Sequence, residues 1–574
     1  MKRVICLVLS FLMMFALVAA CSDSGDTPAN TPAPASPPVT SDGSQTTPED
    51  PSVINWDEHR VFTIWMYSTN NELYSGYSHN PVINYLNQRF NVTLEFIQPP
   101  SGTEADALAL MFGTGQYTDL IDVTTFTGSI GDLYSDGVII DIANYLQYMP
   151  NLVAHMEADS NVRKQFYNDD GRILTLTNFS EYDQTAWGGM VYRHDLLEMM
   201  TGGNVSFPSG YDIPTTVEDW EYMLPLFKMF FEMAGMADFA PLIIPATGTF
   251  WFGELQSGFG FPSPGFYYDT RTNIVNHGYL TDGFYNYITK MSEWFEAGYI
   301  YRDFATRVGD MFFLPNPALT YGSAAGIWYG LQSQLGDSMS MPEHGLFFDV
   351  RPLSTPLDTA NGITAESVIS MVGPRYEDPV SFVVPASTTD IPRLLSIIDF
   401  MYSDDGGMLW QYGLTAEQIP ENDTIYKAAG LSDGAYWFDD NGNFIYNPLV
   451  DQVGGPIAQS DIAGIRMPGF IRNRYNVENL SEEVSEANNI WTRHQGYFRR
   501  LPTKLSLPQE EENLLNTRMV AINDYANAMI PQFIMGSVNF DAAAFADFKA
   551  QLISLGLDDN IRLQQAAIER YMAR

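Results

Sequence analysis

The sequence predicts an α/β protein with more than one domain, and three observations support this prediction. Strand-like and helix-like segments alternate along the chain from Val61 onward. The chain has 574 residues, which is enough for two or three domains. Its two cysteines, Cys6 and Cys21, lie near the N-terminus, so the long remainder cannot form an internal disulfide and must rely on ordinary hydrophobic cores.

The first elements alternate strand with helix. Residues 61–66 have the alternation of a strand, and residues 92–97 return to strand after a helix that begins at Pro81. Residues 104–125 predict a helix, a glycine-containing turn and a third strand. Such units build parallel sheets, whose ligands bind beyond the carboxyl ends of the strands.

The rest of the chain continues this mixture of elements. It predicts, in order, two helices in 130–152, a hairpin in 167–179, a strand and a helix in 187–200, helices in 214–233 and 279–300, a strand in 378–388, one helix in 390–413, a hairpin in 436–448 and a helical stretch from Pro508. We expect Gly406 and Gly407 to end the helix of 390–413. Trp220, Trp294 and Trp410 fall on helical faces, which favours a packing role.

The N-terminus has the pattern of a secretory signal. Lys2 and Arg3 precede an apolar stretch, residues 4–20, which ends in small residues before Cys21. An uncleaved membrane anchor is the alternative, but an anchor gives no reason for a cysteine at this position. Residues 18–21, Val-Ala-Ala-Cys, resemble the lipobox of bacterial lipoproteins. The resemblance implies that residues 1–20 are removed and that Cys21 carries lipid on the extracytoplasmic face of a bacterial membrane.

Residues 22–52 are rich in Ser, Thr and Pro and almost free of aliphatic and aromatic side chains. This composition predicts a disordered tether between the lipidated cysteine and the folded body. The body beyond residue 52 contains no apolar run that could span a bilayer.

Charge and aromatic content limit the class of partner. The formal net charge is -40, from 69 acidic and 29 basic residues, which argues against a nucleic-acid partner and against lying flat on an anionic membrane. Aromatic residues make up 14% of the chain, and a cleft for sugars needs such rings beside polar groups. Most rings must nevertheless belong to the core.

Signatures of catalysis and of metal binding are missing from the sequence. It has no Gly-x-Ser-x-Gly elbow, His-Glu-x-x-His motif or P-loop, and its seven histidines are widely spaced. We expect no cofactor and no metal. Residues 439–443 resemble part of a calcium loop, but no glutamate follows at loop position twelve, which favours a turn. Two carboxylates across a cleft would suffice for a glycosidase, so catalysis is not excluded by sequence.

Six segments in one order resemble the extracellular solute-binding proteins, family 1, of bacterial ABC importers, in their long Gram-positive lipoprotein subgroup. They are residues 111–123, 133–152, 191–200, 294–306, 397–414 and 533–571. The resemblance runs from about Val61 to the C-terminus. The chain departs from the family pattern at Thr118, where proline is usual, and at Ala297, where glutamate is usual.

The resemblance implies a periplasmic-binding-protein fold of the second type, with two α/β lobes joined by a hinge and a helical C-terminal extension. The expected lobes are residues 53–178 with about 380–425, and residues 179–379 with about 426–574, the latter including the C-terminal helices. The expected crossing segments lie near residues 174–182 and 379–387.

The function implied is capture of a solute, expected to be an oligosaccharide, and its delivery to a membrane permease of an ABC importer. The chain is expected to be a monomer and not an enzyme, with permease and ATPase as separate chains. Two alternatives stay open at this point: a surface glycoside hydrolase or lyase, and a sensory or adhesive binding lipoprotein without a permease.

Candidate binding residues are rings and polar groups near strand ends and near the first crossing segment. Those chosen from position alone are Trp65, Tyr67, Thr125, Phe126 and Trp187. Tyr192 matches a tyrosine that contacts sugar in the maltose-binding relatives. Arg193 occupies the next position of the same motif and is a candidate for that reason. Trp251 and Trp328 lie in segments that resemble those from which the same relatives supply stacking rings.

Overall fold

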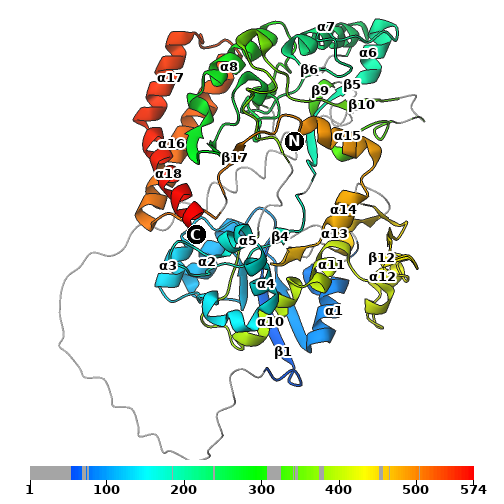
Figure 1. Cartoon of the computed structure of the whole chain (residues 1–574), viewed down its shortest axis with the longest axis vertical. Helices are drawn as coiled ribbons and strands as arrows, with labels where there is room; N and C mark the ends of the chain where they lie inside the picture. Colours follow the sequence, from blue (N-terminus) through cyan, green and yellow to red (C-terminus); the bar gives the residue numbers. More distant parts are fainter. Residues whose placement is uncertain are drawn as a thin grey trace, which may run out of the picture. The chain divides into compact units, whose positions relative to one another are not determined.

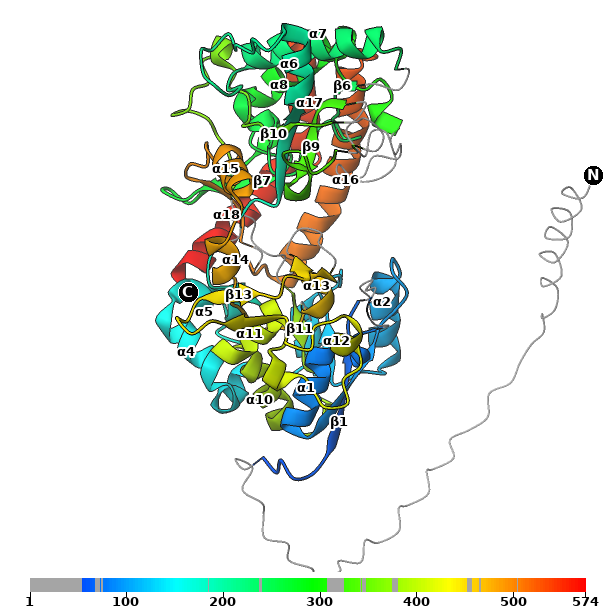
Figure 2. The same ribbon diagram turned by 90° about the vertical axis from the view of Figure 1, so that its right-hand side faces the viewer.

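The computed structural model describes residues 54–67, 73, 76–183, 185–236, 240–306, 325–340, 342, 347–373, 380–451, 457–463, 466–502 and 504–574. Cys21 and the expected tether lie outside the described residues, so the predictions for them stay predictions. Figures 1 and 2 show the chain in two views at right angles.

The first sheet has four strands in the order β11–β3–β1–β2. They are β1 (Arg60–Trp65), β2 (Val92–Ile97), β3 (Leu120–Asp122) and β11 (Phe382–Val383). β1 runs parallel to β2 and β3, whereas β11 is antiparallel to β3 and comes from a segment 260 residues further on in the chain. The parallel units predicted for the first hundred residues of the body are therefore confirmed.

Several helices belong to the same part of the molecule as this sheet, and capping residues in the sequence set where some of them begin. They include α1 (Pro81–Phe90), α2 (Glu104–Thr114), α3 (Ile130–Ser135), α4 (Pro150–Ala158), α5 (Ser160–Phe166), α10 (Ile391–Met401) and α11 (Asp404–Tyr412). α1 begins where the Asn80 side chain accepts the N–H group of Val82 at 2.7 Å and where Pro81 needs no such partner.

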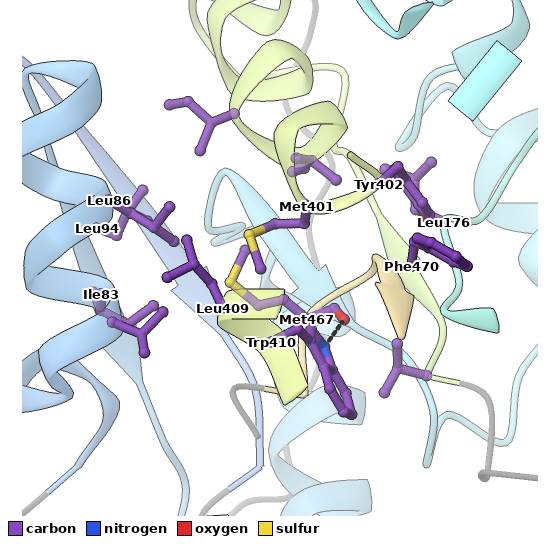
Figure 3. Packing of buried hydrophobic residues seen from close by; sticks show 14 of the residues in the cluster. Ile83, Leu86, Leu94, Leu176, Met401, Tyr402, Leu409, Trp410, Met467 and Phe470 are labelled. Carbon is purple, nitrogen blue, oxygen red and sulfur yellow. Dashed lines mark hydrogen bonds between the residues drawn. The ribbon is translucent and has the colours of Figure 1, made fainter. Parts of the chain in front are cut away.

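The first hydrophobic core lies around this sheet and unites distant parts of the chain. Figure 3 shows Ile83, Leu86 and Leu94 on one side, and Leu409 and Trp410 beside Met401 and Met467. The Trp410 indole N–H donates to the carbonyl of Met467 at 3.1 Å, which satisfies its polar atom within the core. The packing role predicted for Trp410 is confirmed.

Described residues of the segment 426–471 also join this first core, among them Leu431, Tyr436 and Met467. The expected lobe division placed residues beyond about 425 in the second lobe. The difference arises because side chains of this segment, such as Tyr436 and Phe444, pack with Tyr412 at the end of α11.

The second sheet also has four strands, in the order β10–β5–β9–β6. They are β5 (Gly188–Arg193), β6 (Ala240–Leu242), β9 (Ala325–Leu331) and β10 (Val350–Pro352). β5 is antiparallel to β9 and β10, and β6 is parallel to β9. Its helices include α6 (His194–Thr201), α7 (Val217–Met233) and α8 (Asp282–Glu296).

The C-terminal helices complete the second core. α16 (Gln509–Ile534), α17 (Ala542–Ser554) and α18 (Leu557–Ala573) contribute side chains such as Ile530, Phe548 and Leu557 to the cluster that contains Trp220 and Trp294. α16 lies beside α8 in both views (Figures 1 and 2). The predicted helical C-terminus and the packing roles of Trp220 and Trp294 are confirmed.

Short elements complete the described chain. The strands are β4 (Phe179–Ser180), β7 (Phe266–Asp269), β8 (Ile274–His277), β12 (Tyr436–Phe438), β13 (Phe444–Tyr446), β14 (Val450–Asp451), β15 (Ile457–Ala458), β16 (Phe470–Ile471) and β17 (Phe498–Arg500). The helices are α12 (Ile425–Ala428), α13 (Gln459–Ile462), α14 (Arg474–Glu478) and α15 (Glu482–Trp491). β12 and β13 form the predicted hairpin, in which the Asp439 carboxylate accepts the N–H groups of Asn441 and Asn443. None of the helices described here combines the length and the apolar character of a membrane span.

The hairpin predicted for residues 167–179 is wrong. Its turn exists, because the N–H group of Asn168 donates to the carbonyl of Arg172 at 2.9 Å. Leu176, however, pairs with Phe382 and not across the turn. The reason is that both side chains are buried in the first core, which a two-stranded hairpin alone would not provide.

The single helix predicted for residues 390–413 is two helices, α10 and α11. Ser403 begins the second helix by accepting the N–H group of Gly406. A side chain at Gly406 would lie 2.0 Å from the carbonyl oxygen of Phe400, so this glycine permits the close approach of the two helices and does not end one.

Candidate functional site

A cavity of about 600 Å³ lies among segments that belong to both core regions. From the side of the first core, α5 contributes Val162 and Gln165, and β16 contributes Ile471. From the side of the second core come Tyr329 of β9 and Tyr571 of α18. A volume of this size suits a ligand of a few sugar rings.

Aromatic side chains make up much of the lining. They are Phe179, Tyr182, Trp187, Phe252, Tyr268, Tyr329 and Tyr571. Polar groups stand between them, including the side chains of Asn161, Asn178 and Gln495. Flat apolar faces beside hydrogen-bonding groups fit the alternation of C–H and O–H groups on a sugar.

Trp187 reaches the cavity because it directly precedes β5. Its carbonyl accepts the N–H group of Gln332, which continues the pairing of β5 with β9. The two glycines that follow are required by packing, since a Cβ atom at Gly188 would lie 2.6 Å from the carbonyl oxygen of Gly330 and one at Gly189 would lie 2.5 Å from the ring of Trp491. The sequence Trp-Gly-Gly thus places a large ring at the strand end and removes side chains just beyond it.

Three basic side chains line the cavity, and all come from residues 499–504. They are Arg499, Arg500 and Lys504. The guanidinium of Arg500 lies 4.3 Å from the centre of the Phe252 ring, and the ammonium of Lys504 donates to the hydroxyls of Ser381 at 2.5 Å and Thr175 at 3.4 Å. Burial lowers the pKa of Lys504 to about 8.

Three carboxylates line the same cavity but come from separate segments. They are Asp159, Asp183 and Glu254. Asp159 accepts the N–H group of Asn161 at the start of α5. Burial raises the pKa of Glu254 to about 7, although the N–H group of Phe252 donates to its carboxylate and Arg500 opposes the shift. Within the described ranges, His, Cys, Asp and Glu side chains form no cluster that could hold a metal ion.

Comparison with known proteins identifies the fold. No protein-family model and no curated protein sequence matches the chain. Solved structures do match. An HMO-binding, ABC-transporter-associated solute-binding protein from Bifidobacterium longum infantis ATCC 15697 superposes with a TM-score of 0.67 at 15% identity, over 89% of this chain and 99% of that one.

A second match is the S. pneumoniae ABC-transporter substrate-binding protein FusA in complex with kestose, with a TM-score of 0.67 at 16% identity, over 89% of this chain and 99% of that chain. A third is an extracellular solute-binding protein from Bifidobacterium longum subsp. infantis, with a TM-score of 0.67 at 14% identity, over 90% and 100%. This chain has the fold of an extracellular solute-binding protein. The two-lobed α/β architecture expected from the sequence is thereby confirmed.

In this solute-binding-protein fold, Trp187 is the one of the nine candidate binding residues that lines the cavity described above. Trp65, Tyr192 and Trp328 are at most 3% exposed, and each lies within a strand and a hydrophobic cluster. Their packing explains their burial without a ligand, and a contact with ligand stays a prediction for them.

Arg193 is buried as well. Its guanidinium donates to both carboxylate oxygens of Asp195 and stacks 4.1 Å from the centre of the Phe348 ring, so its charge already has a partner. A direct role in binding stays a prediction, but the structure supplies a structural role for this arginine.

The remaining candidates lie at loops outside this cavity. The ring of Tyr67 lies 4.6 Å from the guanidinium of Arg466, and Phe126 packs against Phe112. Thr125 is exposed, and Trp251 is 57% exposed. Their proposed contacts with ligand also stay predictions.

Two cavity residues stand next to a candidate and were missed by one position. Phe252 follows Trp251, and Tyr329 follows Trp328 on β9. A shift of one residue in a strand changes the face to which a side chain points, and sequence alone did not settle that face for β9. The basic residues of 499–504 had a signal of their own, since they cluster in a chain with only 29 Lys and Arg residues.

Proposed function

We propose that this chain is an extracytoplasmic receptor that captures an oligosaccharide in the cavity around Trp187. The observation that carries the proposal is the lining of that cavity, which combines seven aromatic side chains with amide and charged groups. The neighbouring structures support the proposal, because FusA was solved with kestose and the first Bifidobacterium protein is described as HMO-binding.

Capture is proposed to close the two core regions on the ligand. Segments from both regions line the cavity, so one ligand would contact both at once. The ligand shifts the population toward a closed form only by the additional contacts that it makes in that form. The closed form is what a permease would recognise.

The anchor and the partner are part of this proposal. The Val-Ala-Ala-Cys sequence ending at Cys21 supports lipidation on the outer face of a bacterial cell membrane, with residues 22–52 as the tether. We infer delivery to the permease of an ABC importer, because the neighbouring structures are described as ABC-transporter proteins. The receptor is proposed to act as a monomer.

The proposal is tested by expressing residues 22–574, which include the whole compact unit Ile54–Arg574, and measuring thermal unfolding with a panel of oligosaccharides. A ligand at one hundred times its Kd should add about 2.7 kcal/mol to the free energy of unfolding. Recovery of the intact sugar with a raised Tm supports a receptor. No shift with any oligosaccharide would contradict the proposal.

One observation favours a second candidate, a glycoside hydrolase. Glu254 lines the cavity with a pKa raised to about 7, which is the range of a general acid, and Asp159 and Asp183 line it too. The same experiment separates the two functions, because a hydrolase would release shorter sugars that chromatography detects. Glu254→Gln would abolish that release, whereas a receptor releases nothing in either form.

A further inference from the structure

The three basic side chains of the cavity come from one short segment of the chain. β17 supplies Arg499 and Arg500 and pairs with β7, so that Arg499 lies opposite Tyr268, another lining residue. The chain then runs on to Lys504, whose backbone carbonyl accepts a hydrogen bond from Arg574. We call the side chains of Arg499, Arg500 and Lys504 the basic wall.

Arg499 has hydrogen bonds only to backbone within the described part of the chain. Its Nη1 donates to the carbonyls of Gly496 at 2.6 Å and Phe498 at 2.8 Å. None of the ion pairs among described residues includes it, in contrast to Arg271 on the neighbouring turn, which is paired with Asp269. The charge of Arg499 is therefore available to a ligand.

Lys504 is a second cation without a carboxylate partner among the described residues, and its ammonium group is buried. Its ammonium donates to two hydroxyls, those of Ser381 and Thr175, and has no carboxylate partner among the described residues. Burying an ammonium without an opposite charge is costly, and the lowered pKa of Lys504 reflects that cost. An anionic group in the cavity would offset it.

The chain has a large net negative charge, so a group of cations in its cavity is evidence about the charge of the ligand. With 69 acidic and 29 basic residues, the molecule repels anions in general. The three carboxylates of the cavity come from other segments, and burial raises the pKa of Glu254 among them to about 7, so that this group is partly protonated near neutral pH. Two of the cations in the cavity, Arg499 and Lys504, have no carboxylate partner among the described residues, and a ligand with a carboxylate would supply one.

We propose that the ligand is an acidic oligosaccharide, and that a carboxylate of one of its sugar units lies against Arg499 and Lys504 of the basic wall. This inference rests on the proposed function and narrows its substrate class. Charge-assisted hydrogen bonds to the carboxylate would fix the position of that sugar unit, while the aromatic lining would hold the faces of the rings.

The test uses matched pairs of sugars. Oligomers of galacturonate, glucuronate and mannuronate are compared by calorimetry with the same oligomers whose carboxylates have been reduced to alcohols. For at least one pair, we expect the carboxylated sugar to bind at least tenfold more tightly than its reduced partner. The preference should shrink when NaCl is raised from about 50 to 500 mM, because salt screens the charges.

Variants assign the preference to the basic wall. Arg499→Gln should lower the affinity for the carboxylated oligomer about tenfold and leave that for the reduced oligomer within about twofold. Lys504→Met should act in the same direction, and Lys504→Arg, which keeps the charge, should restore most of the preference. Arg493→Gln is the matched control, because Arg493 is exposed and does not line the cavity.

Each outcome decides between the two proposals. Equal binding of carboxylated and reduced oligomers would overturn the acidic-ligand inference and leave the oligosaccharide receptor standing. A preference that Arg499→Gln and Lys504→Met do not change would also overturn it, because the charge would then be recognised elsewhere. Binding of no oligosaccharide, carboxylated, reduced or neutral, would overturn both.

Discussion

Two tryptophans of the second sheet have opposite environments. Trp328 lies in the middle of β9, opposite Val191 of β5, and is 3% exposed. Trp187 lies just before β5, hydrogen-bonded to Gln332 just after β9, and it lines the cavity. The two rings therefore stand on neighbouring strands, four positions apart along the sheet.

The difference shows that position along a strand matters more than residue type. In the middle of β9, the side chain of Trp328 belongs to a buried cluster that includes Leu335 and Phe348. At the strand end, Trp187 meets the cavity. A ring at a strand end is therefore a good candidate for ligand contact, whereas a ring within a strand contacts the cavity only when its own face of the sheet meets it, as Tyr329 of β9 does and Trp328 does not.

The largest effect expected from this comparison is that of Trp328→Ala on stability. The substitution removes a buried ring and its hydrogen bond to Gln334, which is 3.2 Å long. We expect a loss of about 3–5 kcal/mol in the free energy of unfolding, measured by urea denaturation. Trp328→Phe should lose much less. A loss below about 1 kcal/mol would show that the buried ring of Trp328 contributes little to the free energy of unfolding, and would contradict the comparison.

A second expected effect is on pH dependence, and it comes from a residue of the cavity. Burial raises the pKa of Glu254 from 4.5 to about 7. Between these values the folded state keeps a proton that the unfolded state releases, so the free energy of unfolding falls as pH rises from about 4.5 to 7. The fall attributable to Glu254 is on the order of 3 kcal/mol.

Glu254→Gln removes this titration, so the variant should gain stability relative to the parent protein as pH rises through that window, by thermal or urea unfolding. Glu157→Gln, at an exposed glutamate, is the control. Parallel pH profiles of the parent and Glu254→Gln would show that Glu254 is not desolvated. The expected result would refine the comparison between cavity and core positions, because it would show that a cavity-lining residue also influences the free energy of unfolding.

Trp187→Ala should affect binding more than stability. The ring is half-buried and contacts the cavity, so we expect affinity for the oligosaccharide to fall about tenfold, which is about 1.4 kcal/mol. Titration calorimetry measures the loss, and Trp187→Phe should recover part of it. An unchanged affinity together with a large loss of stability would place Trp187 with Trp328 and break the comparison.

Trp251→Ala should have the smallest effect. The ring is 57% exposed and lies outside the cavity, although its neighbour Phe252 lines it. We expect the free energy of unfolding to change by less than about 0.5 kcal/mol and affinity to stay within about twofold. A tenfold loss of affinity would instead support the sequence-based expectation that this ring contacts the ligand.

Local sequence sufficed for much of the fold. α1 begins at Pro81 as predicted, α7 lies in the helical range predicted for residues 214–233, and β12 and β13 form the predicted hairpin. Each of these features depends on residues within a few positions of one another, which is why spacing and turn residues predict them. The resemblance of six ordered segments to solute-binding proteins then predicted the two-lobed architecture.

The candidate site was predicted less well, because its parts are distant in the chain. Trp187 was found since it stands at a strand end near the first crossing segment. Tyr329 was missed by one residue, and Tyr571 gave no signal, because the position of α18 beside the cavity follows from contacts between remote segments. A strand that is buried on both faces has no alternation to reveal which side chain meets a ligand.

By itself, the sequence determined the α/β class, the order of most helices and strands, the acidic charge and the packing roles of Trp220, Trp294 and Trp410, because these depend on composition and on short-range periodicity. Only the tertiary structure decided that Leu176 pairs with Phe382, that residues 426–471 join the first core, and that rings from five or more segments meet the basic wall in one cavity. These are contacts between segments that are separate in the chain, in the case of Leu176 and Phe382 by about two hundred positions. They are selected by which buried surfaces fit together, and no local pattern in the chain records that fit.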